Sequence, residues 1–128
     1  VAIVSSGVAR FIGSIAHMLN VDDWAANDFS WDENGFLAGP KPAMVDSHDK
    51  GIMVKKLSEI NNFDPAKIWT VGDSSTDLSM RIPGSNFIGF NPARKRASDA
   101  FKNANVPTVL KRDLREIWPI IFNEEFSN

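Results

Sequence analysis

The chain has 128 residues, of which 43% are hydrophobic and 23% charged, so it is long and apolar enough for one globular domain. A net charge of −2 argues against general attraction to nucleic acid or to anionic membranes. The lack of cysteine excludes disulfides and thiolate metal sites, and neither a membrane-spanning run nor a basic-then-apolar leader is present. We therefore expect a cytoplasmic protein that binds neither nucleic acid nor membrane.

The first part of the chain indicates a strand, a helix and a hairpin. Residues 1–4 are continuously apolar, which is typical of a buried strand, and the polar stretch 5–7 is expected to end it. Because chain termini usually lie on the surface, a core strand at the first residue indicates that a segment precedes it. Residues 24–31 and 36–37 flank an Asn34-Gly35 turn and predict a hairpin, followed by a loop at 39–42. Between them a helix is expected over residues 8–20, where apolar side chains recur at helical spacing: Val8, Phe11, Ile12, Ile15 and Leu19.

Helices and strands alternate in the rest of the chain. We expect a helix over residues 48–61, a buried strand over 68–71 and a short helix through Met80. A strand over 86–89, a helix over 93–103 and a strand over 106–110 follow, and Asp113 is placed to cap a last helix. This order predicts an α/β fold: a Rossmann-like parallel sheet with helices on both faces and the hairpin as an insertion. Such sheets bind their ligands beyond the carboxyl ends of the strands.

Two polar groups near the expected strand ends suit a phosphate. Ser5 offers a hydroxyl, and Ser6 and Gly7 offer backbone N–H groups, just before a helix N-terminus, where anions bind readily. A plain helix cap is the alternative interpretation of this turn. Lys50 opens the second helix and supplies a compact positive charge, although a solvated lysine is the simpler interpretation of that residue alone.

A third polar group follows the strand over residues 68–71. Gly72 permits a tight turn, and Asp73 and Asp77 supply carboxylates of the kind that hold Mg²⁺ together with water and substrate phosphate. The alternative is that Asp73 caps a helix and Asp77 is an exposed helical residue. Phosphate donors, a lysine and an acidic site at the strand ends of one sheet together indicate phosphoryl transfer with Mg²⁺.

Three segments carry a resemblance to a known family. VAIVSSG, HDKGIMVKKL and VGDSSTDLSM resemble the second, third and fourth motifs of the haloacid dehalogenase (HAD) superfamily, and more narrowly of its phosphoserine phosphatases. The resemblance implies that Ser5 and Lys50 bind phosphate, that Asp73 binds Mg²⁺ and that Asp77 supports the metal site. It extends over nearly the whole chain, since the stretch containing Asn27 and the hairpin, IGFNPARKRASDAF and LKRDLREIWPII also resemble this subfamily.

Two residues depart from the subfamily pattern. Ser6 stands where these phosphatases usually have glycine, and Thr76 stands where they usually have asparagine. Both positions neighbour the phosphate in the resemblance, so both substitutions bear on how phosphate or the serine moiety is held.

The first motif of the family is absent from this chain. In the family an aspartate attacks phosphorus, and a second aspartate two residues later acts as general acid and then base. The aspartates here are at positions 22, 23, 28, 32, 46, 49, 64, 73, 77, 99 and 113, and no two of them are separated by two. The resemblance also implies a missing substrate-selecting cap and a missing first strand between the strands ending at Val4 and Val71. A chain with that gap would expose unpaired backbone and is not expected to be stable or active alone.

We therefore interpret residues 1–128 as the C-terminal part of a HAD-like phosphatase core, incomplete at its N-terminus. The predicted function is Mg²⁺-dependent hydrolysis of a small phosphorylated metabolite through an aspartyl-phosphate. Phosphoserine, and hence serine biosynthesis, is favoured. The nucleophile would lie outside this chain, and the expected protein partners are the missing N-terminal half or another copy of the chain.

Two alternatives remain open. One is a non-catalytic module that binds phosphate and Mg²⁺ or a partner; the other is a HAD phosphatase for another small metabolite, such as a sugar phosphate or a nucleotide. His17 and His48 are interpreted as non-catalytic, because the family's scheme uses carboxylates for proton transfer.

Overall fold

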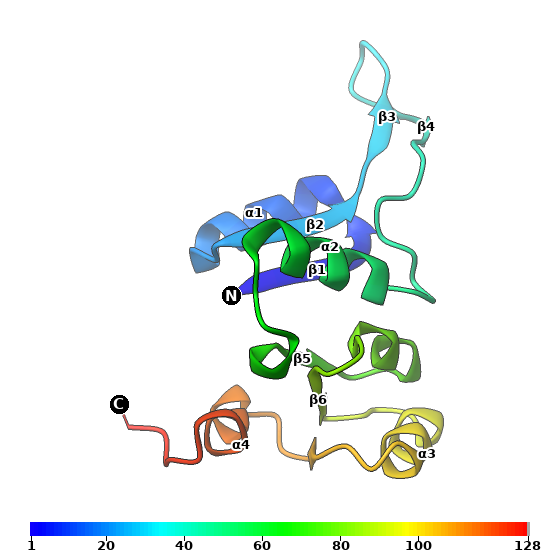
Figure 1. Cartoon of the computed structure of the whole chain (residues 1–128). Coiled ribbons are helices and arrows are strands. Elements are labelled where there is room, and N and C mark those ends of the chain that lie inside the picture. The colour runs from blue at the N-terminus through cyan, green and yellow to red at the C-terminus, as the bar shows by residue number, and fades with distance from the viewer. Residues whose placement is uncertain (128) are drawn as a thin grey trace.

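The fold is known from a computed structural model that describes residues 1–127. Strands and helices alternate along it (Figure 1). No helix in this described part is both long and apolar enough to cross a bilayer. The elements in chain order are β1 (Ala2–Val8), α1 (Ala9–Leu19), β2 (Asp23–Asn27), β3 (Phe29–Trp31), β4 (Leu37–Pro40), α2 (Gly51–Asn61), the 3₁₀ helix η1 (Pro65–Lys67), β5 (Trp69–Gly72), the 3₁₀ helix η2 (Ser75–Met80), β6 (Asn86–Phe90), α3 (Lys95–Asn103), β7 (Thr108–Val109), the 3₁₀ helix η3 (Leu114–Ile117) and α4 (Trp118–Phe122).

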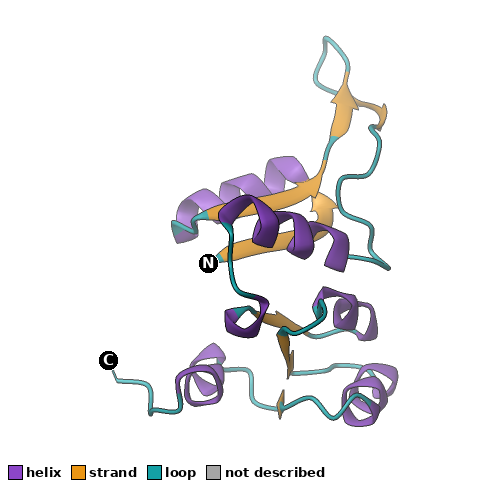
Figure 2. Cartoon of the chain, in the orientation of Figure 1, coloured by secondary structure: helices purple, strands orange, loops and turns teal. Residues whose placement is uncertain are grey.

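The parallel strands form two separate groups. β1 pairs with β2, with Ile3 opposite Trp24, and β5, β6 and β7 form a second sheet in that order, with Val71 opposite Ile88. In Figure 2 α1 lies behind the β1–β2 pair and α2 lies in front of it. The predicted α/β fold with helices on both faces of a parallel sheet is confirmed.

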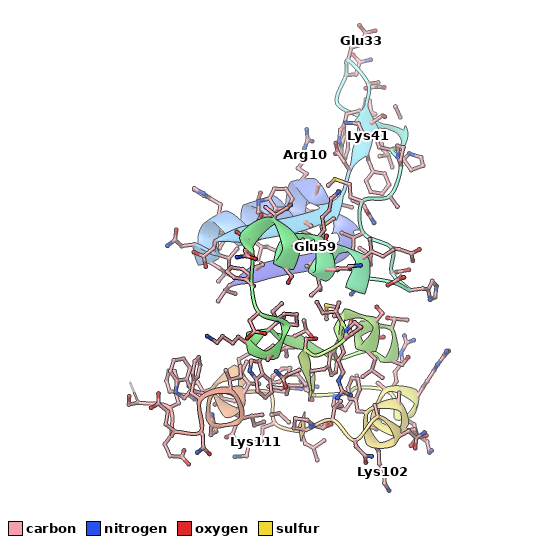
Figure 3. All side chains as sticks on the ribbon, viewed as in Figure 1. Arg10, Glu33, Lys41, Glu59, Lys102 and Lys111 are labelled. Atoms are coloured by element: carbon pink, nitrogen blue, oxygen red, sulfur yellow. The ribbon has the colours of Figure 1, made fainter. Side chains whose placement is uncertain are left out.

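The β3–β4 hairpin projects from this core as an antiparallel insertion. Phe29 pairs with Pro40 at its base, where the ammonium group of Lys41 lies 2.7 Å from the carboxylate of Asp28. Gly35 has a φ of +82° in the turn, a conformation that glycine adopts without steric cost. Glu33 marks the tip, far from Lys102 and Lys111 at the other end of the molecule (Figure 3). The predicted hairpin is confirmed, although its second strand continues through Pro40, where a loop was expected.

Several other predicted boundaries were wrong. β1 does not end at residue 4 but continues to Val8, with a shift in its pairing with β2 between Val4 and Val8. The strand expected over 24–31 is divided into β2 and β3, which pair with different partners. α2 begins at Gly51 rather than 48, because residues 46–49 form a turn in which Asp46 accepts the backbone N–H groups of His48 and Asp49.

Two apolar clusters hold the fold together. The larger lies between the β5–β6–β7 sheet, α3 and η2, and its Phe87 and Phe101 rings pack 5.5 Å apart between centroids. The smaller joins β2 to α2 through Ala25, Val45 and Met53. Val4 packs against both clusters and is therefore a link between the two groups of strands.

The faces predicted to be buried on β1 and α1 are largely open. Val1 and Ala2 are exposed, and Phe11 on α1 is 66% exposed. α1 instead turns Ala16 and Gly13 inward, and the Trp24 ring packs so closely on Gly13 that a Cβ there would lie 2.9 Å from it. The apolar periodicity identified the helix correctly, but the described residues do not cover its apolar side.

Asp113 caps η3, as the sequence predicts. Its Oδ1 accepts the backbone N–H of Arg115 at 3.0 Å, and the guanidinium of Arg115 hydrogen-bonds both carboxylate oxygens. These contacts lower the pKa of Asp113 from 3.8 to about 2. The hydrogen bond from the Arg115 side chain is the main cause, and the hydrogen bond from its backbone N–H is the second. Since the folded pKa is depressed, this cap stabilises the fold above pH 3.8 and its contribution is lost as the pH falls through about 2.

An NMR titration of the Asp113 carboxyl carbon should therefore have its midpoint near pH 2. Arg115→Ala is expected to move the midpoint up toward 3.8, whereas Lys102→Ala, on α3, should leave it in place. A midpoint near the ordinary value in the unmodified protein would contradict the pairing.

Candidate active site

A cleft of about 1070 Å³ separates the two groups of parallel strands. One wall is formed by Val1 and the first three residues of β1, and the other by Trp69–Gly72 of β5. Within residues 1–127, β1 pairs only with β2, and β5 pairs only with β6, so each of the two strands has one unpaired edge. Apolar residues from α2, η3 and α4 also line the cleft: Val54, Leu57, Ile117 and Ile121. The gap predicted between the strands ending at Val4 and Val71 is present.

Three charged residues line this cleft near the carboxyl end of β5: Lys50, just before α2, and Asp73 and Asp77, which follow Gly72 at the end of β5. Other charged residues line the cleft elsewhere: Asp22, Asp23, Asp64 and Lys67. The ammonium group of Lys50 lies 2.6 Å from Oδ1 of Asp77. Both side chains are largely buried, with 15% and 7% of their surfaces exposed, so solvent weakens this ion pair much less than a surface pair.

Asp77 holds the loop after β5 as well as the lysine. Its Oδ2 accepts the backbone N–H groups of Asp73 at 3.1 Å and Ser74 at 3.0 Å, and with Ser74 it completes a capping box for η2. A Cβ on Gly72 would lie 2.2 Å from the Asp77 Cβ, so only glycine leaves room for this side chain. The alternative in which Asp77 is an exposed helical residue is wrong.

Asp73 presents its carboxylate differently. The residue is exposed and lines the cleft, and its side chain accepts no hydrogen bond from residues 1–127. The alternative in which Asp73 caps the helix is also wrong, because Ser74 is the N-cap of η2. Asp73 is therefore a carboxylate left free to bind a ligand or a cation beside a fixed lysine.

The Ser5–Gly7 turn is the irregular stretch in the last part of β1, and it directly follows the residues of β1 that line the cleft. In Figure 1 β1 and β5 both run from left to right, so the turn and the Asp73 loop lie at the same end of the strands. The N–H of Gly7 donates to Oγ of Ser5 at 3.0 Å, and Ser6 is exposed. No hydrogen bond within residues 1–127 joins this turn directly to Lys50 or Asp73. The structure thus joins Lys50 and Asp73 through the Asp77 carboxylate, whereas Ser5 makes no hydrogen bond to any of these three residues within residues 1–127, and its predicted place at the phosphate stays a prediction.

Thr76 faces the loop that carries it. Its hydroxyl lies 3.1 Å from the Ser74 hydroxyl, and its carbonyl accepts the hydroxyl of Ser79 at 2.8 Å. Its predicted place next to the phosphate stays a prediction.

Sequence reasoning missed two residues that support the site. The Ser79 hydroxyl accepts the backbone N–H of Lys50 at 3.0 Å, so it attaches the start of α2 to η2. Gly51 permits this approach, because a Cβ there would lie 2.1 Å from the Ser79 carbonyl oxygen. The Lys-Gly pair at a helix start was a visible signal of such close packing. Asn27 is the second missed residue. Its side chain hydrogen-bonds the backbone of Ser6 and of Val45, and both contacts are far from it in the sequence.

The donor set fits Mg²⁺ in part. Within residues 1–127 no three acidic or histidine side chains converge on one point. Asp77 already accepts three hydrogen bonds, whereas Asp73 offers a free carboxylate at the cleft. Mg²⁺ is commonly held by one or two carboxylates with water and substrate phosphate, so Asp73 suits such an ion if another segment contributes further oxygen ligands.

The sequence and the structure of the chain were compared with those of known proteins, and only the structure has matches. No protein-family model matches the sequence, and no curated protein sequence matches it. Among solved structures, an apo phosphoserine phosphatase matches 94% of the chain with a TM-score of 0.79 and 28% sequence identity. The chain has a haloacid dehalogenase-like fold. A substrate-bound phosphoserine phosphatase complex matches the same share of the chain with a TM-score of 0.78 and 28% identity.

The HAD-like fold recurs in more distant structures. A probable phosphoserine phosphatase from Vibrio cholerae has a TM-score of 0.77 at 16% identity, which supports the fold alone. The chain covers 57% of the apo phosphatase, 55% of the substrate complex and 36% of the Vibrio protein, so it spans about half the length of the first two. The predicted resemblance to the HAD superfamily and to phosphoserine phosphatase is confirmed.

Proposed function

We propose that residues 1–128 carry the phosphate- and metal-binding part of a HAD phosphatase that hydrolyses a small phosphomonoester. The observation that supports this proposal best is the cluster of Lys50, Asp73 and Asp77 near the carboxyl end of β5, in the cleft between β1 and β5. Phosphoserine is the favoured substrate, because the matched structures at 28% identity include an apo phosphoserine phosphatase and a substrate-bound phosphoserine phosphatase complex. Ser6 stands in place of the usual glycine, and Thr76 stands in place of the usual asparagine. Because both substitutions bear on how the substrate is held, other small phosphate esters should be tested beside phosphoserine.

Each polar residue has a distinct role in this proposal. An ammonium group has three N–H donors, so Lys50 keeps two for phosphate oxygens while one binds Asp77. The free carboxylate of Asp73 holds Mg²⁺, and Asp77 fixes both the lysine and the Asp73 loop. Bound Mg²⁺ would neutralise phosphate charge as a Lewis acid.

The turn at the end of β1 binds the remaining phosphate oxygens. The Ser5 oxygen accepts the N–H of Gly7, and its hydroxyl proton is still available to donate to a phosphate oxygen. The backbone N–H of Ser6 is a further donor, and Thr76 borders the same region. Gly7 contributes its small size rather than its N–H, which revises the role predicted for that N–H.

The nucleophile is proposed to enter the cleft as part of an added strand. The unpaired edges of β1 and β5 would each gain a partner if such a strand ran parallel to both, and its carboxyl end would reach Lys50 and Asp73. An aspartate there attacks phosphorus, and the ester oxygen leaves with a proton from a second carboxylic acid. Water then hydrolyses the aspartyl-phosphate, which yields an alcohol and inorganic phosphate. The added strand would come from the missing N-terminal half, because these 128 residues contain no Asp-x-Asp pair.

Asp73→Asn in the whole protein should lower Mg²⁺-dependent release of phosphate from phosphoserine by about 100-fold or more, since several kcal/mol of charge stabilisation would be lost. The matched control is Asp99→Asn on the exposed side of α3, which should leave turnover unchanged. Phosphoserine, a sugar phosphate and a nucleotide should be compared side by side.

Full activity of the Asp73→Asn variant would sink the assignment of Asp73. Binding of phosphate and Mg²⁺ without turnover of any ester would instead favour the non-catalytic module. That alternative is specific, because these 128 residues contain no Asp-x-Asp pair.

A further inference from the structure

The side chain of Asn27, at the end of β2, bridges two segments: the Ser5–Gly7 turn of β1 and the stretch at Val45 that leads to Lys50 and α2. Its Oδ1 accepts the backbone N–H of Val45 at 2.8 Å, and its Nδ2 donates to the Val45 carbonyl, also at 2.8 Å. The same Nδ2 donates to the Ser6 carbonyl at 3.2 Å. We propose that Asn27 is a positioning residue that sets the Ser5–Gly7 turn relative to Lys50. For its effect on phosphate, this inference rests on the proposed function.

The Ser6 contact lies where β1 departs from regular pairing. Val4 pairs with Ala25, and Val8 pairs with Asn27, so three residues of β1 oppose a single residue of β2. The pairing shift leaves Ser5, Ser6 and Gly7 outside the regular register. A side chain that grips the Ser6 carbonyl therefore restricts this turn where the strand ladder does not.

The Val45 contact leads to the lysine. Val45 is 1% exposed and belongs to the apolar cluster with Met53 of α2. A compact turn over residues 46–49 follows, closed by hydrogen bonds to Asp46, and Lys50, the N-cap of α2, comes directly after it. Asn27 is thus the anchor of a short, packed connection that ends at the lysine.

A carboxamide suits this position because the three contacts require both donors and an acceptor. Both N–H groups of the carboxamide are used, on two different carbonyls, while its oxygen takes one N–H. An ionised aspartate has the same shape but only acceptors, so it would face the carbonyls of Ser6 and Val45 with repulsion. An alanine would leave the buried Val45 backbone groups without this partner, which is costly in a dry environment.

The test compares Asn27→Ala and Asn27→Asp with Asn86→Ala in the whole protein. Asn86 is a matched control, because its Nδ2 also donates to two carbonyls, those of Ala66 and Ile68, at the opposite end of the strands. Backbone amide NMR of the ligand-free protein should show that Asn27→Ala moves both Ser6 and Gly7 and, together with them, residues 45–50. Asn86→Ala should move neither group.

The second measurement is the affinity for inorganic phosphate in the presence of Mg²⁺. Both Asn27 variants should bind phosphate about tenfold more weakly or worse, since small misplacements of binding groups are costly, and Asn86→Ala should bind it as the unmodified protein does. Urea unfolding shows that each variant is folded under the assay conditions. Asn27→Ser, which keeps one hydroxyl donor, serves if the alanine variant does not fold.

Two results would overturn the inference: unchanged Ser6 and Gly7 amides in Asn27→Ala, or unweakened phosphate binding by Asn27→Asp. If the unmodified protein binds no phosphate, the proposed function fails instead, and the amide measurements still decide whether Asn27 joins the two segments.

Discussion

Asp77→Ala is expected to destabilise the whole protein by about 3–5 kcal/mol, because breaking a buried ion pair leaves the other charge uncompensated. The variant leaves the Lys50 ammonium group, whose side chain is 15% exposed, without the carboxylate 2.6 Å away. It also removes the acceptor for the N–H groups of Asp73 and Ser74, so the loop after β5 loses its closure. Urea unfolding measures the loss, and phosphate affinity should fall with it because Lys50 is no longer held.

A second ion pair provides a control at the same distance. Lys95 and Asp99 on α3 also lie 2.6 Å apart, but their side chains are 87% and 54% exposed. Exposed pairs four residues apart on a helix contribute about 0.3–0.5 kcal/mol, so Asp99→Ala should cost less than 1 kcal/mol. Equal losses in the two variants would mean that burial does not set the value of the Lys50–Asp77 pair, and the structural role given to Asp77 would be wrong.

The alternation of strands and helices was predictable because it depends on local signals. Apolar runs of four residues identified β1 and β5, and helical periodicity identified α1 and α2. The Asn34-Gly35 pair identified the hairpin turn, and Asp113 identified a cap. Each signal lies within a few residues of the feature that it predicts.

The site was partly predictable for the same reason. Gly72, Asp73 and Asp77 stand directly after a strand, so their spacing alone placed two carboxylates at a strand end. The spacing did not predict that the two carboxylates have different environments. Asp77 is buried against Lys50, 27 residues away, while Asp73 is exposed and its carboxylate is free. That division depends on how α2 packs on η2, which only the folded chain determines.

Long-range contacts account for the other misses. Ser79 binds the backbone N–H of Lys50 across 29 residues, and Asn27 binds Val45 across 18. The exposed faces of β1 and α1 were missed because periodicity reports that a side is apolar but not what covers it. Phe11 illustrates the point, since it sits at a proper helical position and is still 66% exposed.

Gly72→Ala is expected to disrupt the same cluster by a different route. A Cβ at this position would lie 2.2 Å from the Asp77 Cβ and 2.7 Å from its Cγ, so either the end of β5 or the Asp77 side chain must move. Overpacking of this kind costs about 1–3 kcal/mol and sometimes more. Gly39→Ala in β4 is the control, because a Cβ there meets nothing within 4 Å, and it should be neutral or stabilising by about 0.5 kcal/mol.

A double-mutant cycle identifies the clash. If the Asp77 side chain is what opposes a methyl group at residue 72, then Gly72→Ala should cost much less in an Asp77→Gly background than in the unmodified protein. Urea unfolding of the four proteins gives the coupling free energy. Equal costs in the two backgrounds would show that Gly72 is needed for its own backbone and not for Asp77. A large coupling would show that the glycine is there so that Asp77 can lie beneath the Asp73 loop and hold Lys50 at the cleft.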